Sequence, residues 1–439
     1  MTDARRRSPV DRPAHGHRFD AHRILRAVTM ALQPPRLVIG LLMVTALVTA
    51  GRVWDAATTP TYTPRGVLGG AWTVDDQVVL ERVQRDAILS RIDDPAARPP
   101  GEPDTWLLRP DETIDRLEAH VRARRASAPD VEDIAAEDAA YLATVARIRA
   151  AMPQGSFAST SRHVIERLHR ITQGVLFLHV DDVFEATTDL FVRLPRALWR
   201  TTPMFAAVYG LIALLILAIG GGALSRMAAC DFAGQERLRV RQAIDFAAGA
   251  AMRLALAPIL PLVFAGLLVL LITLLGLLTT VPWLNVIGGI LYGFALVLGF
   301  LATFLLLLYA TGFVLLGPAV ACENCDPIDA LQRSYAYVLR RPLHLVAYGI
   351  VAIIGLAVGY VIVSLFAVVT LDLTALAFER LTQTRALAGA GGVRLWDLGG
   401  VDATPLPTST SETATAFFID FWQTVVVCLV AAYVFAYFF

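Results

Sequence analysis

The second half of the chain alternates long uncharged apolar runs with short polar segments. The runs cover residues 204–224, 254–279, 286–317, 343–371 and 416–439. A helix of about 20 apolar residues crosses the roughly 30 Å hydrocarbon layer of a bilayer. With a further apolar stretch near the N-terminus, this pattern predicts an all-α polytopic membrane protein. We expect six transmembrane helices, at residues 35–54, 203–225, 255–279, 285–317, 343–370 and 416–439.

The distribution of arginine predicts the topology, because short cytoplasmic loops carry an excess of positive charge. The first 36 residues hold eight arginines and the segments 226–253 and 318–342 hold five and three, whereas the short connection 280–284 is uncharged. We therefore predict a bacterial cytoplasmic membrane protein whose basic tail (residues 1–34) and C-terminus lie on the cytoplasmic side. The segments 55–202 and 371–415 are predicted to lie on the opposite side. Val48-Thr49-Ala50 loosely resembles a signal-peptidase site, but the preceding basic region is very long for a signal peptide. We expect an uncleaved anchor.

Two inner segments between spans have the pattern of amphipathic helices. Asp326-Pro327 is a favourable helix start, and the apolar positions that follow it recur at helical spacing. We expect this helix to lie in the membrane interface, and a plain connecting role is the alternative. The arginines predicted to meet lipid headgroups are Arg333, Arg340 and Arg341.

The region 203–370 is predicted to form a four-helix membrane core with an internal parallel repeat. Aligning Ala243 with Ala330 also aligns Arg253 with Arg340. Each unit, 203–279 and 285–370, then reads as span, inner amphipathic helix, span. Such a repeat places like faces around an axis along the membrane normal.

The outer segment 55–202 is predicted to be mainly helical. Helical apolar stripes follow Pro110 and Asp130. An outer layer packed on the span ends and an independent domain both fit this pattern. His179 and Asp182 bring an imidazole near a carboxylate, which a hydrolytic or metal site could use, but no known catalytic motif accompanies them. A solvated helix end is the simpler interpretation.

Composition narrows the possible functions. The chain is 56% hydrophobic and 17% charged with a formal net charge of zero, which argues against a nucleic-acid partner. The thiols of Cys322 and Cys325 form a C-x-x-C, and Cys230 lies in the other inner loop. Thiolates at this spacing can bind zinc or shuttle electrons. Because a structural zinc needs four ligands, ordinary reduced thiols are the favoured interpretation, and no cofactor is expected.

The absence of ionisable side chains from the middle of the predicted spans narrows the possible functions further. Ion-coupled transporters place ionisable side chains inside the bilayer, and the middle of every predicted span has none. A permease could instead use a polar cavity lined by Tyr292, Tyr309 or Tyr360, whose plainer role is hydrogen bonding between helices.

Two pairs of small residues in the spans allow helix backbones to approach closely. They are Gly289 with Gly293 and Gly355 with Gly359. Intramolecular packing is the favoured interpretation, and an oligomer or partner interface is the alternative.

The inner loop also carries a resemblance. The stretch 326–342, together with residues 227–233 and Ala257-Pro258, resembles a part of uncharacterised multi-span integral membrane proteins of planctomycete-type bacteria. The resemblance covers roughly residues 200–370. It implies an integral membrane protein, carries no known activity and assigns no catalytic or binding residue. The cysteine pair is not part of that pattern.

Together these observations predict a non-enzymatic membrane scaffold or accessory subunit. Its expected partners are membrane lipids and either other proteins or further copies of itself. The alternative is a permease for an uncharged or lipidic substrate, and an enzyme in the outer domain is a third possibility.

Overall fold

The prediction of an all-α membrane protein is confirmed. The computed structural model describes residues 21–89, 110–127, 131–234, 238–280, 284–382 and 410–439, and within them regular structure is helical apart from two isolated bridges at Tyr62. Six helices are long and apolar enough to cross a membrane. They are α2 (Pro34–Ala57), α9 (Pro203–Phe232), α11 (Ala251–Leu277), α12 (Leu284–Glu323), α14 (Pro342–Thr382) and α16 (Thr410–Phe438).

Several of these helices extend past their apolar runs. Proline occupies the first turn of α2, α9 and α14, where its missing N–H leaves no hydrogen bond unmade. At the other end, α9 continues through Arg226 and Asp231 to Phe232, and α12 continues through Pro318 to Glu323. The connections from α9 to α10 and from α12 to α13 are therefore shorter than the apolar pattern suggests.

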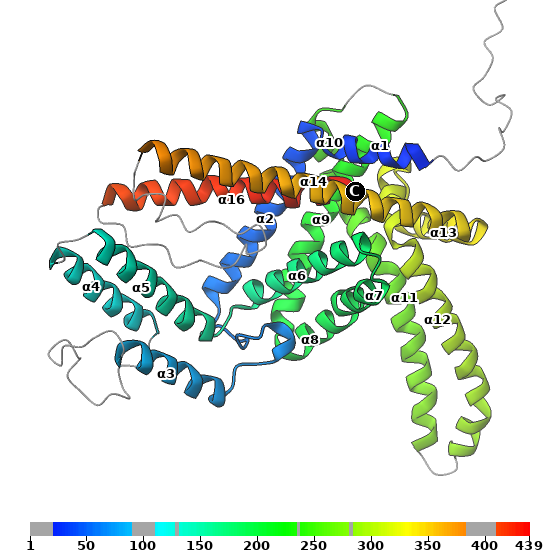
Figure 1. Cartoon of the computed structure of the whole chain (residues 1–439). Helices are drawn as coiled ribbons and strands as arrows, with labels where there is room; N and C mark the ends of the chain where they lie inside the picture. Colours follow the sequence, from blue (N-terminus) through cyan, green and yellow to red (C-terminus); the bar gives the residue numbers. More distant parts are fainter. Residues whose placement is uncertain (1–20, 90–109, 128–130, 235–237, 281–283, 383–409) are drawn as a thin grey trace, which may run out of the picture.

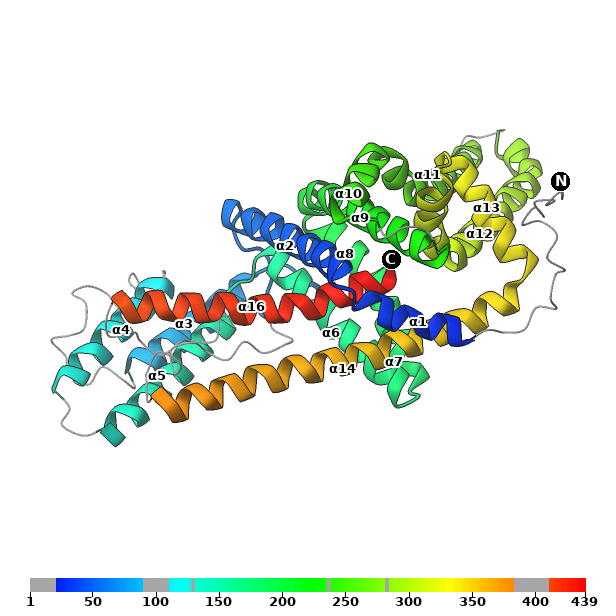
Figure 2. The same ribbon diagram turned by 90° about the horizontal axis from the view of Figure 1, so that it is seen from above.

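The six long helices do not form one parallel bundle. α11 and α12 pack on each other along their length, while α14 packs mainly on α16 and on α1 (Ala21–Ala31). The two pairs leave a common region in different directions (Figures 1 and 2). Of the four helices in the predicted core 203–370, α9, α11 and α12 pack together and with α2. The fourth, α14, packs on α16 and α1 instead.

Short helices lie beside this common region. α10 (Val240–Gly249) and α13 (Pro327–Arg340) connect α9 to α11 and α12 to α14, so the order long–short–long occurs twice along the chain. α1 lies in the segment predicted as a basic tail, and its Val28 faces Gly355 and Gly359 of α14. Sequence analysis did not predict α1.

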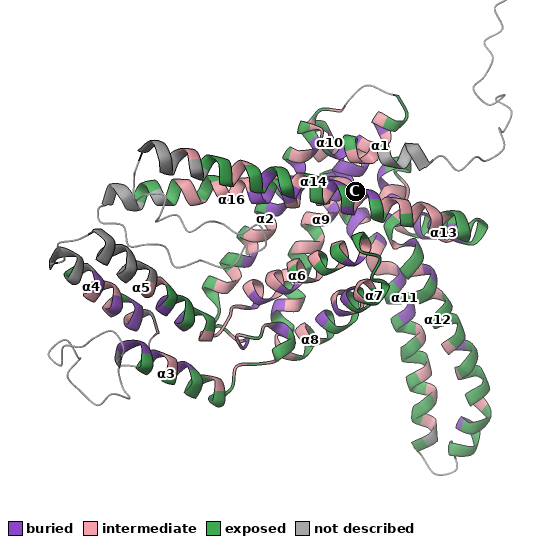
Figure 3. Ribbon diagram, in the orientation of Figure 1, coloured by how far each residue is buried: buried purple, intermediate pink, exposed green. Residues whose placement is uncertain are grey.

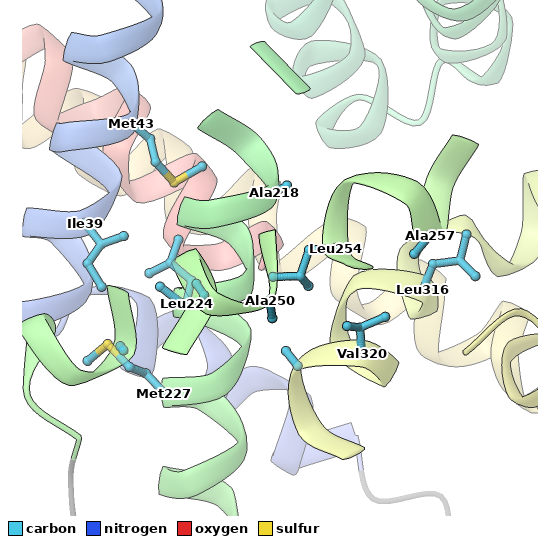
Figure 4. Close-up of a cluster of buried hydrophobic side chains, with 14 of the residues drawn as sticks. Ile39, Met43, Ala218, Leu224, Met227, Ala250, Leu254, Ala257, Leu316 and Val320 are labelled. Atoms are coloured by element: carbon cyan, nitrogen blue, oxygen red, sulfur yellow. The ribbon is translucent and has the colours of Figure 1, made fainter. Parts of the chain in front are cut away.

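Buried side chains concentrate where the long helices meet, and the far end of the α11–α12 pair is mostly exposed (Figure 3). The main cluster joins α2, α9, α11 and α12, with Met43, Leu224, Leu254 and Leu316 among its members (Figure 4). We call this region the helix-end junction. It comprises the ends of α2, α9, α11, α12 and α16 that meet around Arg36, Arg226, Leu254, Pro318 and Phe439.

The outer segment is helical, as predicted, and has two parts. α3 (Val74–Leu89), α4 (Pro110–Ser127) and α5 (Val131–Ala151) share a small core of their own. α6 (Ser156–Leu176), α7 (Val180–Thr188) and α8 (Leu194–Thr201) lie closer to the spans, with the short 3₁₀ helix η2 (Val67–Gly69) beside them.

Asp55 fastens this second part to the first span. Its carboxylate oxygens accept the backbone N–H groups of Phe157 and Ala158, each at 2.8 Å. These are unpaired donors in the first turn of α6, so a side chain of α2 caps another helix. The segment thus contains one helical unit with a core of its own and a second unit joined to α2.

Candidate functional site

One outer segment buries a charge and exposes its aromatic side chains. α7, the π-helical turn η4 (Asp189–Arg193) and α8 follow one another without interruption. Asp189 is 1% exposed, whereas Phe184 and Phe191 are 74% and 70% exposed. Proteins usually bury large apolar side chains, and they almost never bury an aspartate fully unless it is paired. Here the aromatic side chains are exposed and the aspartate is buried.

Paired cations explain the burial of Asp189. Nη1 of Arg193 donates to its Oδ1 at 2.7 Å, and Nε of Arg167 on α6 lies 3.3 Å from its Oδ2. His163, one turn before Arg167, is also buried. The π-helical turn directs Asp189 into this cluster, and such turns often occur at functional sites.

The exposed aromatic side chains form a defined surface that we call the elbow patch. Its members lie at the turn into α7 and along α7, η4 and α8, each more than 60% exposed: Phe177, Leu178, Val180, Phe184, Phe191 and Trp199. Leu178 adopts a positive φ of 57°, unusual for a residue with a branched side chain, and is 83% exposed. Exposed large apolar side chains grouped along successive helices are typical of a surface that contacts another protein or the membrane.

The predicted pair His179 and Asp182 lies at the edge of this surface. Nδ1 of His179 is 3.5 Å from Oδ2 of Asp182, one turn apart at the start of α7. Both side chains are exposed, 67% and 48%. They approach each other as the sequence suggested, but in the open position of a solvated helix end rather than in a cleft.

The buried histidine makes the outer part sensitive to pH. Burial and, secondarily, Arg167 lower the pKa of His163 below its ordinary 6.5, with Asp189 and Glu166 opposing this in part. Folded His163 is therefore neutral where unfolded His163 already binds a proton. We expect stability to be complete above about pH 6.5 and to fall as the pH drops below it.

Thermal unfolding in mild detergent between pH 7.5 and 5 measures this effect. His163→Gln should reduce the slope of the profile in that window, because glutamine has no proton to bind; burial also lowers the pKa of His169, so part of the slope remains. Leu168→Gln, at a 44% exposed position on the same helix, changes no ionisable group and should leave the slope unchanged. Equal slopes for wild type and His163→Gln would contradict the assignment.

The helix-end junction contains a buried ion pair between two neighbouring helices that lie far apart in the sequence. Nη2 of Arg36, at the start of α2, donates to Oδ2 of Asp231, at the end of α9, at 2.8 Å. Their side chains are 4% and 14% exposed. Arg36 lies at the start of the predicted span 35–54, and the structure adds its carboxylate partner, which the sequence did not indicate.

Two further arginines of the junction bind the end of α12. Nη1 of Arg226 donates to the carbonyl oxygens of Ala321 and Cys322, and Nη1 of Arg253 donates to that of Asn324, all at 3.1 Å. The guanidinium of Arg226 also stacks over the ring of Phe246, 4.9 Å from its centroid. Cations at a helix C-terminus satisfy unpaired carbonyls and complement the helix dipole.

An apolar cavity of about 140 Å³ lies in the helix-end junction. Its lining comes from α9, α11, α12 and the end of α16 and includes Leu217, Pro258, Phe313 and Phe439. Neither Tyr292, Tyr309 nor Tyr360 lines it. Instead Tyr292 is exposed on α12, and the other two pack against the main buried cluster.

The two predicted glycine pairs have different surroundings. A Cβ on Gly355 would lie 2.6 Å from Oη of Tyr437, and one on Gly359 would meet Oη of Tyr433, so α14 approaches α16 closely here. Gly289 and Gly293 face open space. The tightest backbone approach involves Gly40 instead, where a Cβ would lie 2.5 Å from the carbonyl oxygen of Ala432.

The three predicted thiols differ in their surroundings. Cys230 is buried, Cys322 is exposed, and Sγ of Cys325 lies 3.6 Å from the carbonyl oxygen of Ala319. Burial raises the pKa of the Cys325 thiol, so it is protonated at neutral pH. Across the described residues, no group of three or more His, Cys, Asp or Glu side chains could hold a metal ion.

The predicted headgroup arginines lie on α13 and at its end. Arg333, Arg340 and Arg341 are all exposed, and Arg333 forms an ion pair with Glu323 of α12. The buried face of α13 consists of Ala330, Leu331, Ser334 and Val338. The side chain of Ser334 donates to the carbonyl oxygen of Gly312 at 2.9 Å, which fixes α13 against α12.

Comparisons with protein-family models, with curated proteins and with solved structures found no match to this chain.

Proposed function

We propose that this chain is a non-enzymatic membrane scaffold or accessory subunit that holds another protein through its outer segment. The elbow patch is the observation that carries this proposal. A folded segment that buries Asp189 and exposes Phe184 and Phe191 has an apolar surface that another molecule can cover. Aromatic side chains are enriched at the energetic centres of protein interfaces.

The chemistry within the membrane supports the same proposal. Arg36, Asp231, Arg226 and Arg253 are engaged in contacts between helices. The cavity beside them is apolar and is not lined by the tyrosines that a polar passage would use. These four charged side chains therefore join helices to one another.

Partner recovery from mild detergent tests the proposal. The full chain is purified by affinity from its native membrane, and co-purifying proteins are quantified by mass spectrometry. We expect Phe177→Ser/Phe184→Ser to lower partner recovery more than tenfold, since buried interface aromatics contribute about 2 kcal/mol or more each. Val74→Ser, which changes an exposed apolar residue on α3, is the matched control and should retain the partner.

The alternative function is a permease for an uncharged or lipidic substrate, and the apolar cavity is the observation in its favour. A permease should move its substrate as a single purified species in liposomes. Substrate flux by a chain that recovers no partner, or equal recovery by wild type and the double variant, would contradict the scaffold proposal.

A further inference from the structure

The cavity at the helix-end junction has the size and lining of a site for a hydrocarbon chain. Its volume is about 140 Å³, and its walls are apolar side chains, glycines and prolines. An apolar cavity of about this volume stays dry in soluble proteins and binds small hydrocarbons. Leu217, Phe313 and Val314 provide surfaces that an acyl chain can contact.

A cation lies directly above this cavity. Arg226 follows Gly222, which lines the cavity, by four residues on α9, and its guanidinium binds Cys322, four residues after Pro318 of the lining on α12. Four residues correspond to one helical turn, or about 6 Å along the axis. Arg226 therefore spans α9 and α12 one turn beyond the apolar lining.

A second cation lies beside it. Arg253 directly precedes Leu254, another lining residue, and binds the carbonyl oxygen of Asn324. Within the described part of the chain, neither Arg226 nor Arg253 is within ion-pair distance of a carboxylate, unlike Arg36 or Arg333. Two guanidinium groups without a carboxylate partner among the described residues thus lie at one end of the apolar lining.

We infer that the helix-end junction binds an anionic phospholipid, with one acyl chain in the cavity and the phosphate at Arg226 and Arg253. The positions of the arginines and the apolar lining match those of the two parts of a phospholipid, whose charged headgroup lies at the membrane surface with its hydrocarbon chains below. Guanidinium groups pair well with phosphate oxygens. The carbonyl contacts of both side chains hold them in place and leave other N–H groups of each guanidinium for a phosphate.

Arg226 and Arg253 also stabilise the end of α12, so replacing them could weaken lipid binding by disturbing the fold. A further variant must therefore block the lipid and leave both arginines unchanged. Gly317 provides this separation. It lines the cavity, yet a Cβ placed on it would meet nothing within 4 Å. Gly317→Phe therefore fills the cavity without a backbone clash and leaves both arginines in place. Gly266→Phe is the matched control, because Gly266 also faces open space but does not line the cavity.

Native mass spectrometry of the full chain in mild detergent tests the inference. The probes are phosphatidylglycerol and phosphatidylcholine with identical acyl chains, added to delipidated protein. We expect phosphatidylglycerol to be retained more strongly than phosphatidylcholine. Arg226→Gln and Arg253→Gln should each lower that retention about fivefold. Gly317→Phe should abolish retention of phosphatidylglycerol, and Gly266→Phe and Arg241→Gln, at a 93% exposed side chain, should not change it.

Three outcomes would overturn the inference. Equal retention of the two lipids would show that the arginines do not select an anionic headgroup. Retention of phosphatidylglycerol by Gly317→Phe would show that the cavity does not hold an acyl chain. Protection by inorganic phosphate alone, measured as an equal rise in unfolding temperature, would identify a phosphate site rather than a lipid site. The lipid site and the elbow patch lie on different elements, so either can fail without the other.

Discussion

Replacing Arg36 by methionine is expected to destabilise the protein by about 3–5 kcal/mol. The substitution leaves the carboxylate of Asp231 buried without its partner, and an uncompensated buried charge carries a penalty of that size. Replacing both residues, Arg36→Met with Asp231→Leu, should recover most of the loss, because an apolar pair of similar volume needs no hydration. Thermal unfolding in mild detergent measures both effects.

The chain contains a matched surface pair for this experiment. Nε of Arg241 lies 3.8 Å from Oδ2 of Asp245, with the side chains 93% and 70% exposed. Such pairs contribute about 0–1 kcal/mol. Arg241→Met should therefore leave the unfolding midpoint nearly unchanged. If Arg36→Met and Arg241→Met shift the midpoint equally, the buried pair is not a principal contact between α2 and α9.

Gly40→Ala is expected to destabilise the contact between α2 and α16 by about 1–3 kcal/mol. The added Cβ would lie 2.5 Å from the carbonyl oxygen of Ala432, and backbone cannot move aside as a flexible side chain can. Gly210→Ala, on the open face of α9, is the control. There alanine should be neutral or stabilising, since glycine inside a helix costs about 0.5–1 kcal/mol relative to alanine.

A graded third variant sharpens this comparison. A Cβ on Gly220 would meet the thioether side chain of Met43, which is flexible. We expect Gly220→Ala to fall between the other two variants. Destabilisation in the order Gly210, Gly220, Gly40 supports close backbone approach as the cause, whereas three equal effects would indicate a general loss of helix flexibility instead.

The spans could be predicted from sequence because length and lack of charge are sufficient to identify them. Their ends could not be predicted, because a charged residue ends an apolar run but not the helix that carries it. α9 continues through Arg226 and Asp231, which contact α12 and Arg36. The partner of Asp231 lies 195 positions away in the sequence, and no local pattern indicates it.

The same reasoning explains the glycines and the outer site. Spacing shows that Gly289 and Gly293 share a helix face, but it does not show whether another helix approaches that face. The elbow patch was missed because Phe184 and Phe191 recur at the spacing of a buried stripe. A usable signal is present, since Asp189 lies between them and Arg193 follows it at the i,i+4 spacing of a helical ion pair.

The central claim is that this chain works as part of a protein assembly, and the mass of the particle extracted from its native membrane tests it most directly. Membrane fragments are excised with an amphipathic polymer, without detergent, and weighed by mass photometry against a 47.6 kDa chain. We predict a particle containing at least one additional polypeptide, lost in Phe177→Ser/Phe184→Ser. A single chain in wild-type particles, competent for substrate flux after reconstitution, would contradict the account.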